Sequence, residues 1–175
     1  MSQRFRNFLL ALIIFTPASM LGQTTAPVDL QRYPKMVWYT CLFLPIVSAS
    51  NKTTTWNFSN TFSLGFATGI NILYSDRLGF SFDLSPVITA SNGTSKVGNF
   101  IFDPGPIFRF KKGYSLITRM AFETAGRYGE STVISKVFSP GKKSSLLAAL
   151  GIPLRFGNNL PASVGATVFF GVAFK

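Results

Sequence analysis

The segment Leu78-Gly79-Phe80-Ser81-Phe82-Asp83-Leu84-Ser85 has a bulky apolar side chain at every even position and a small or polar one at every odd position. Successive side chains of a β-strand point to opposite faces, so this alternation predicts a strand with one apolar face and one small, polar face. The same parity holds between Phe58 and Phe174 in the stretches that are predicted to be extended. The sequence therefore predicts an all-β fold, and the remaining question is which face meets water.

Turn-forming residues divide the chain into eight predicted strands. These are residues 36–47, 56–74, 78–89, 98–110, 114–125, 132–138, 145–156 and 162–174. Polar loops at 48–55, 90–97 and 126–131 alternate with tight turns at 75–77 and 111–113, and the connections at 139–144 and 157–161 complete the series. A three-residue turn keeps even positions on one face of an antiparallel pair, so an up-and-down arrangement is predicted. For the first and sixth strands, the sequence does not decide whether the even or the odd positions face the lumen.

Two eight-stranded barrels share this pattern, and composition favours one of them. A lipocalin-like lipid carrier has its apolar face inside and needs a highly charged exterior, but only 13% of the residues are charged. Small residues such as Gly65, Ala67, Gly105 and Gly151 on the odd face suit a narrow lumen filled by side chains. A closed barrel also pairs every backbone group, as hydrocarbon requires. We therefore expect an eight-stranded antiparallel transmembrane β-barrel with its apolar face outward and a small, polar lumen; the soluble lipid carrier is the alternative.

The first residues have the layout of a secretory signal. Arg4 and Arg6 precede an apolar run of residues 8–15, and small residues follow. The run is shorter than the roughly 20 residues that cross a bilayer. The sequence predicts a signal peptide at 1–22, a short periplasmic lead at 23–35 and the barrel at 36–175. Cleavage after Ala18 or Met20 and a buried N-terminal helix are the alternatives.

The signal, the eight alternating strands and the final Thr167-Val168-Phe169-Phe170-Gly171-Val172-Ala173-Phe174 together resemble a known family. They are similar to the small eight-stranded outer-membrane β-barrel proteins of Gram-negative bacteria, of the OmpA/OmpX type. The resemblance implies Sec-type export to the outer membrane, contact with its lipids and lipopolysaccharide, and a monomer. It also implies that the barrel-assembly machinery recognises a C-terminal aromatic signal, here Phe170 and Phe174.

Aromatic residues are predicted to mark the two membrane interfaces, where barrels carry aromatic girdles. Those expected at the end with the short turns are Tyr74, Phe110 and Tyr114, and those expected at the opposite end are Trp56, Phe58 and Phe156.

Charged residues inside the predicted strands lie on the odd, lumen-facing positions. They are Asp83, Asp103, Arg109, Arg119, Glu123 and Arg155, three acids and three bases. Because unpaired charge in a narrow lumen is costly, this balance predicts a network of ion pairs, with Asp103 in reach of Arg119. Lys136 is assigned to the same network, since a basic residue facing lipid at mid-bilayer costs roughly 2–4 kcal/mol. The network is predicted to plug the barrel, and a gated polar path is the alternative.

Several functions are disfavoured by what the sequence lacks. There is no histidine, the usual general base, and a single cysteine, Cys41, so no catalytic, metal or cofactor residues are assigned. The net charge of +11 comes largely from Lys and Arg in the signal and at the short turns, a distribution that favours lipid phosphates over nucleic acid. The prediction is a non-enzymatic barrel with a structural or surface-interaction role; a small-solute or ion pore is the alternative.

Overall fold

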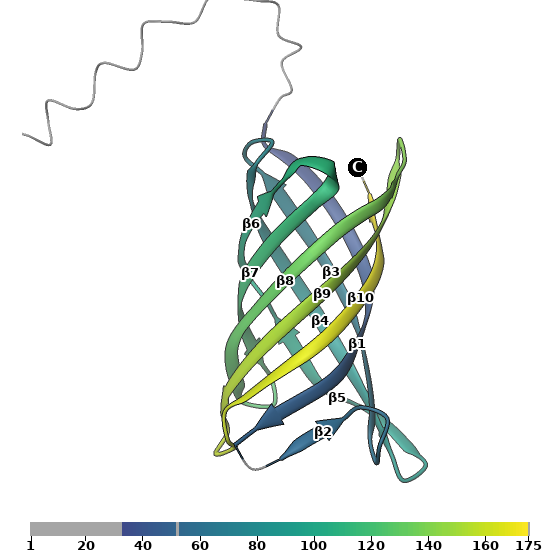
Figure 1. Cartoon of the computed structure of the whole chain (residues 1–175), viewed down its shortest axis with the longest axis vertical. Coiled ribbons are helices and arrows are strands. Elements are labelled where there is room, and N and C mark those ends of the chain that lie inside the picture. Colours follow the sequence, from purple (N-terminus) through teal and green to yellow (C-terminus); the bar gives the residue numbers. More distant parts are fainter. Residues whose placement is uncertain (1–32, 52, 175) are drawn as a thin grey trace, which may run out of the picture. The chain divides into compact units, whose positions relative to one another are not determined.

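The computed structural model describes residues 33–51 and 53–174 (Figure 1). The strands and one short helix are β1 (Lys35–Ser50), β2 (Thr54–Trp56), β3 (Phe62–Leu73), β4 (Leu78–Ser91), β5 (Thr94–Phe102), β6 (Gly105–Arg109), η1 (Lys111–Gly113), β7 (Tyr114–Glu123), β8 (Arg127–Pro140), β9 (Ser144–Gly157) and β10 (Ser163–Phe174). The predicted signal peptide and nearly all of the lead lie outside the described residues. No helix in the described part of the chain is long and apolar enough to cross a membrane.

The strands close into a ring of eight antiparallel strands, which confirms the predicted fold class. Each strand pairs with its neighbour in the chain, and β5 and β6 together occupy one position between β4 and β7. The ring closes where β1 pairs with β10, from Trp38 opposite Phe174 to Ser50 opposite Ser163. The short strand β2 pairs only with the end of β1 (Figure 1).

Side-chain direction follows the parity of the sequence. On β1, Tyr39, Cys41 and Phe43 are buried in the barrel, whereas Trp38 and Leu42 are exposed on its outer surface. The outward face is apolar in the other strands too, as at Leu84, Phe102, Phe122, Leu150 and Phe170. The apolar face therefore points outward, and the lipocalin-like alternative is wrong.

The two ends of the barrel differ less in their connections than the sequence indicates. At the turn end (residues 74–77, 110–113 and 141–143) the connections are short as predicted. At the loop end (residues 51–61, 92–93, 124–126 and 158–162), the predicted loop at 90–97 is wrong, because β4 and β5 continue to a two-residue turn at Asn92-Gly93, both with positive φ. The predicted loop at 126–131 is also wrong, since β8 begins at Arg127. These segments are polar, but their backbones still pair.

Two predicted strands are interrupted. The segment 98–110 breaks at Asp103-Pro104, where Pro104 has no backbone N–H to donate, and its carbonyl accepts from the Met120 amide at 2.9 Å. The predicted strand at 56–74 begins only at Phe62, because the Asn57 side chain binds the backbone of Ser63 at 2.7 and 2.9 Å and turns the chain.

β-bulges explain why two strands were difficult to phase from the sequence. In β1 the register with β10 shifts between Pro45 and Val47. The alternation of inward and outward side chains is therefore interrupted within the strand. In β8 a shift between Val137 and Ser139 acts in the same way. Before that shift, Val133 faces the lumen and Ile134 faces outward.

The outward position of Phe102 allows a test of which strand face meets the lipid. Phe102 lies between Leu84 and Phe122 on the outer surface. Phe102→Arg is expected to lower the free energy of unfolding by about 2–4 kcal/mol, because a charge then faces hydrocarbon. Val97→Arg, on the β4–β5 hairpin beyond the last β7 pairing at Glu123, is the matched control and should cost roughly 0–1 kcal/mol. The measurement is denaturant unfolding in lipid vesicles, and equal losses at both positions would contradict the assignment.

Candidate functional site

The lumen contains two cavities that share one wall. The outer vestibule, a cavity of about 400 Å³, is lined by residues near the loop end such as Ser48, Asn57 and Ser163. The inner chamber, a cavity of about 150 Å³, is lined by residues towards the turn end such as Leu73 and Ser115. Asp83, Arg119, Val133 and Phe169 line both cavities. These shared residues separate the two spaces.

Four polar residues from three strands form the central network in this wall. Arg119 of β7 donates from Nη1 to Asp83 Oδ2 at 3.0 Å and from Nη2 to Tyr39 Oη at 2.7 Å and Ser81 Oγ at 2.8 Å. Tyr39 of β1 donates to Asp83 Oδ2 at 3.1 Å. All four side chains are buried. The network therefore links β1, β4 and β7 across the lumen and obstructs the path between the cavities.

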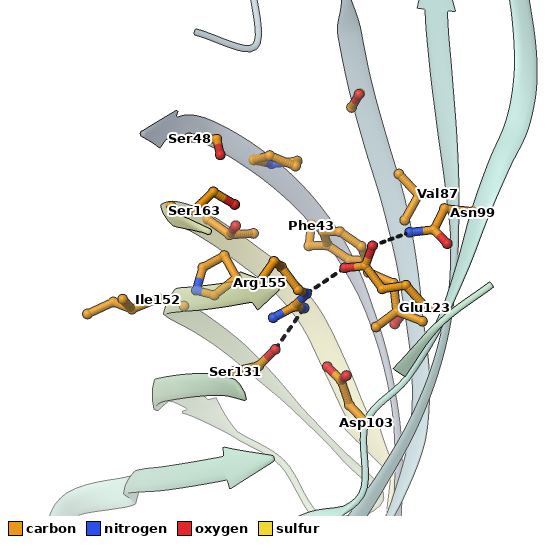
Figure 2. A pocket seen from close by; sticks show the side chains of 18 of the residues that line it. Phe43, Ser48, Val87, Asn99, Asp103, Glu123, Ser131, Ile152, Arg155 and Ser163 are labelled. Atoms are coloured by element: carbon orange, nitrogen blue, oxygen red, sulfur yellow. Dashed lines mark hydrogen bonds and ion pairs between the residues drawn. The ribbon is translucent and has the colours of Figure 1, made fainter. Parts of the chain in front are cut away.

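A second ion pair lies in the vestibule (Figure 2). Arg155 of β9 donates from Nε to Glu123 Oε1 at 2.5 Å and from Nη2 to Ser131 Oγ at 3.0 Å. Asn99 of β5 donates to the other carboxylate oxygen of Glu123 at 2.8 Å. Both charges are thus compensated, and their hydrogen-bonding groups connect the strands that surround the vestibule.

Asp103 has no such partner. Its side chain lines the vestibule below Arg155 and Ser131 (Figure 2), yet within the described residues no cation lies in ion-pair range of its carboxylate. The expected Asp103–Arg119 contact is wrong, because Arg119 is turned towards Asp83, where three acceptors converge. Register alone placed Asp103 close by but did not identify the better set of acceptors.

Two further predicted network members lie elsewhere. Arg109 lines the inner chamber, and no acid in the described part of the chain forms an ion pair with it. The assignment of Lys136 to the lumen is wrong: it lies opposite the outward-facing Tyr114, its Nζ lies 4.2 Å from that ring's centroid, and it donates to the Lys112 carbonyl. At the turn end its amine reaches the barrel rim, so it avoids the cost of charge at mid-bilayer.

The predicted interface aromatics are all exposed. Tyr74, Phe110 and Tyr114 lie at the turn end, and Trp56, Phe58 and Phe156 lie at the loop end. Tyr128 was missed because it falls in a predicted loop; its ring stacks with Phe156 at a centroid distance of 6.3 Å. Phe170 and Phe174, the predicted assembly signal, face outward on β10.

Sequence reasoning also missed the uncharged members of the two networks. Tyr39, Ser81, Asn99 and Ser131 all occupy odd positions, so parity was a signal that could have placed them in the lumen. Their contacts depend on neighbours from distant strands. Within the described residues, no group of three or more His, Cys, Asp or Glu side chains is placed to hold a metal ion.

Comparisons with known proteins support the fold and no finer assignment. No protein-family model matches the chain. No curated protein matches it either. Among solved structures, a barrel from the de novo design of transmembrane β-barrels superposes with a TM-score of 0.53 at 9% identity, over 82% of this chain and 97% of that one. The de novo designed TMB2.3, solved by solution NMR, gives a TM-score of 0.50 at 9% identity, over 83% and 98%. The outer membrane protein OprG from Pseudomonas aeruginosa gives a TM-score of 0.45 at 6% identity, over 82% of this chain and 96% of OprG. The chain thus has the fold of small transmembrane β-barrels.

Proposed function

We propose that this chain is a non-enzymatic outer-membrane β-barrel with a structural or surface-interaction role and a closed lumen. The observation that carries the proposal is the central network, in which Arg119 binds Asp83, Tyr39 and Ser81 across the barrel. A network in which every charge is paired is costly to break, because loss of one partner leaves the other charge buried and uncompensated. Such a network favours a rigid barrel over an open channel.

Membrane lipids are the proposed partners at the turn end. The basic residues there are Arg77, Lys111, Lys112, Lys142 and Lys143, all in turns beyond the apolar belt. Basic residues next to a membrane are attracted to anionic headgroups by about 1 kcal/mol each near the surface. With the turn end in the periplasm, as in the OmpA/OmpX type, these residues meet the inner-leaflet phosphates.

Contacts at the loop end are proposed to involve lipopolysaccharide through Lys96. Arg127 is less suited to this role than the sequence indicated, because its Nη2 already donates to the Arg155 and Pro161 carbonyls at 3.0 and 2.9 Å. Sec-type export, recognition of Phe170 and Phe174 by the barrel-assembly machinery, and a monomeric state complete the proposal. The absence of histidine from the sequence supports a role other than catalysis.

A gated pore is the second candidate, and the two cavities favour it. The vestibule and the inner chamber share a wall formed in part by Asp83 and Arg119, so movement of these side chains would remove the polar part of that wall. In the closed-lumen proposal these side chains stay in place; in the pore proposal they move during function.

Gel mobility and conductance test the proposed function together. Full-length protein from a Gram-negative outer-membrane fraction should migrate differently before and after boiling, because a closed barrel resists detergent. Reconstituted into a planar bilayer, the same protein should show no stable conductance steps. Stable steps from a heat-modifiable barrel would support the pore instead, and a soluble protein with no mobility shift would contradict both functions.

A further inference from the structure

Three acids and three bases line the outer vestibule, and four of these six residues form two ion pairs. Asp83 pairs with Arg119 at 3.0 Å and Glu123 pairs with Arg155 at 2.5 Å. Asp103 lines the same cavity, and its side chain is 8% exposed. Its Oδ1 is fully buried and has no hydrogen-bond partner. The vestibule therefore presents a buried carboxylate that forms no ion pair within the described part of the chain and has one oxygen without a hydrogen bond.

A buried carboxylate that has no ion-pair partner and one oxygen without a hydrogen bond is costly in a protein interior. A neutral residue of the same shape avoids that cost, so the barrel would be more stable without the charge. The position is also next to an open cavity rather than inside packed core. A cation that enters the vestibule offsets the charge of Asp103.

The walls of the vestibule indicate what kind of cation fits. Val87, Ile101, Phe43 and Phe169 line it beside the polar groups, and the two phenylalanine rings are 5.4 Å apart. Its volume of about 400 Å³ lies within the range of small-molecule sites, which combine apolar walls with a few polar anchors. A bare metal ion would require several oxygen ligands around it. An organic cation with an apolar body matches both the carboxylate and the walls.

The other unpaired charge near the vestibule is already engaged. Arg127 lines the same cavity but donates from Nη2 to the carbonyls of Arg155 and Pro161, the latter next to the start of β10. Its Nη2 is therefore held against the wall, while its buried Nε has no hydrogen-bond partner. Among the three acids that line the vestibule, Asp103 is the one without an ion-pair partner, and its carboxylate attracts positive charge.

We propose that the outer vestibule binds a small organic cation, a protonated primary amine with a short apolar body, with its ammonium group on Asp103 and its apolar body against Phe43, Val87 and Ile101. This site is independent of whether the central network opens.

The probe for this site is n-butylammonium chloride, titrated into the full-length protein in detergent micelles and followed by the backbone amide resonances. Saturable shifts are expected at Ile101, Asp103 and Ser131, with none at Ile107 and Ile117 of the inner chamber. Asp103→Asn keeps the side-chain shape and removes the charge, so it should fold, as its heat-dependent gel mobility will show. Loss of a hydrogen bond to a charged group should weaken butylammonium binding by about ten-fold or more.

Asp76→Asn is the matched control, because it removes the same charge in the turn between β3 and β4, away from the vestibule. It should bind butylammonium as tightly as the parent protein. Unchanged affinity in Asp103→Asn, or equal binding of sodium or butyrate, would overturn the proposal. If Asp103→Asn does not fold, the titration of the parent protein still tests the proposal. The proposal is overturned if butylammonium causes no resonance shifts, or if the shifts fall on lipid-facing residues such as Phe102.

Discussion

Replacement of Arg119 by alanine is expected to lower the free energy of unfolding by about 3–5 kcal/mol, the cost of removing one partner from a buried ion pair. The substitution removes three hydrogen bonds, to Asp83, Tyr39 and Ser81, and leaves the Asp83 carboxylate buried without its cation. Equilibrium denaturant unfolding in lipid vesicles measures the loss. Since Arg119 and Asp83 form part of the wall between the cavities, the variant is also expected to show bilayer conductance, whereas the parent protein is expected to show none.

Arg77→Ala is the control, since Arg77 lies in the exposed turn between β3 and β4. It should change stability by less than about 0.5 kcal/mol, as surface substitutions usually do. The double variant Arg119→Ala/Asp83→Ala separates the ion pair from packing. It should lose less stability than the sum of the two single variants, because no charge is then left alone. Strict additivity would mean that lumen water already compensates both charges.

Gly105→Ala is expected to destabilise the barrel by about 3 kcal/mol, the upper end of the usual cost of overpacking. A Cβ at this position would lie 2.0 Å from the Thr118 carbonyl oxygen and 2.6 Å from Arg119 Cα. Both are backbone atoms of β7, so no rotamer change relieves the contact and the strands must move apart. The shift also disturbs Arg119, and the measurement is again unfolding in vesicles.

Gly98→Ala provides the matched control on β5. A Cβ there meets only the Thr89 hydroxyl at 3.7 Å, an ordinary contact. Alanine costs less backbone entropy than glycine in a strand, so stability should stay the same or rise slightly. If both alanine variants unfold alike, the close approach at Gly105 is relieved by movements of the backbone that cost little.

Side-chain facing was predictable from the sequence because a strand has a period of two. Parity alone placed Asp83 and Arg119 inside and Phe102 outside. Parity also places Lys136, at an even position, on the outer face. The lumen assignment overrode parity on the cost of charge at mid-bilayer, and it was wrong because at the barrel rim a long amine reaches water from an outward position. Strand boundaries were less predictable: Glu130 lies in β8 rather than in the predicted loop at 126–131, and it accepts a hydrogen bond from the Thr132 hydroxyl at 2.6 Å.

Partner choice and strand ends were not predictable for a different reason. Arg119 prefers Asp83 because Tyr39 and Ser81 converge at the same point, and that convergence arises from strand register across the whole ring. The turn at Asn92-Gly93 was hidden by polar flanking residues. Outside the membrane both faces of a hairpin meet water, so alternation disappears although backbone pairing continues.

The pairing of β1 with β10 has a consequence for how the chain reaches its final state. The two strands lie at opposite ends of the described sequence, so the ring has open edges on β1 and β9 until β10 is in place. Unpaired edges expose donors and acceptors that hydrocarbon does not tolerate and that attract other chains in water. Insertion one strand at a time is therefore disfavoured, and folding is slowed by contacts between distant parts of the chain. Until synthesis reaches Phe174, the polypeptide requires protection from aggregation.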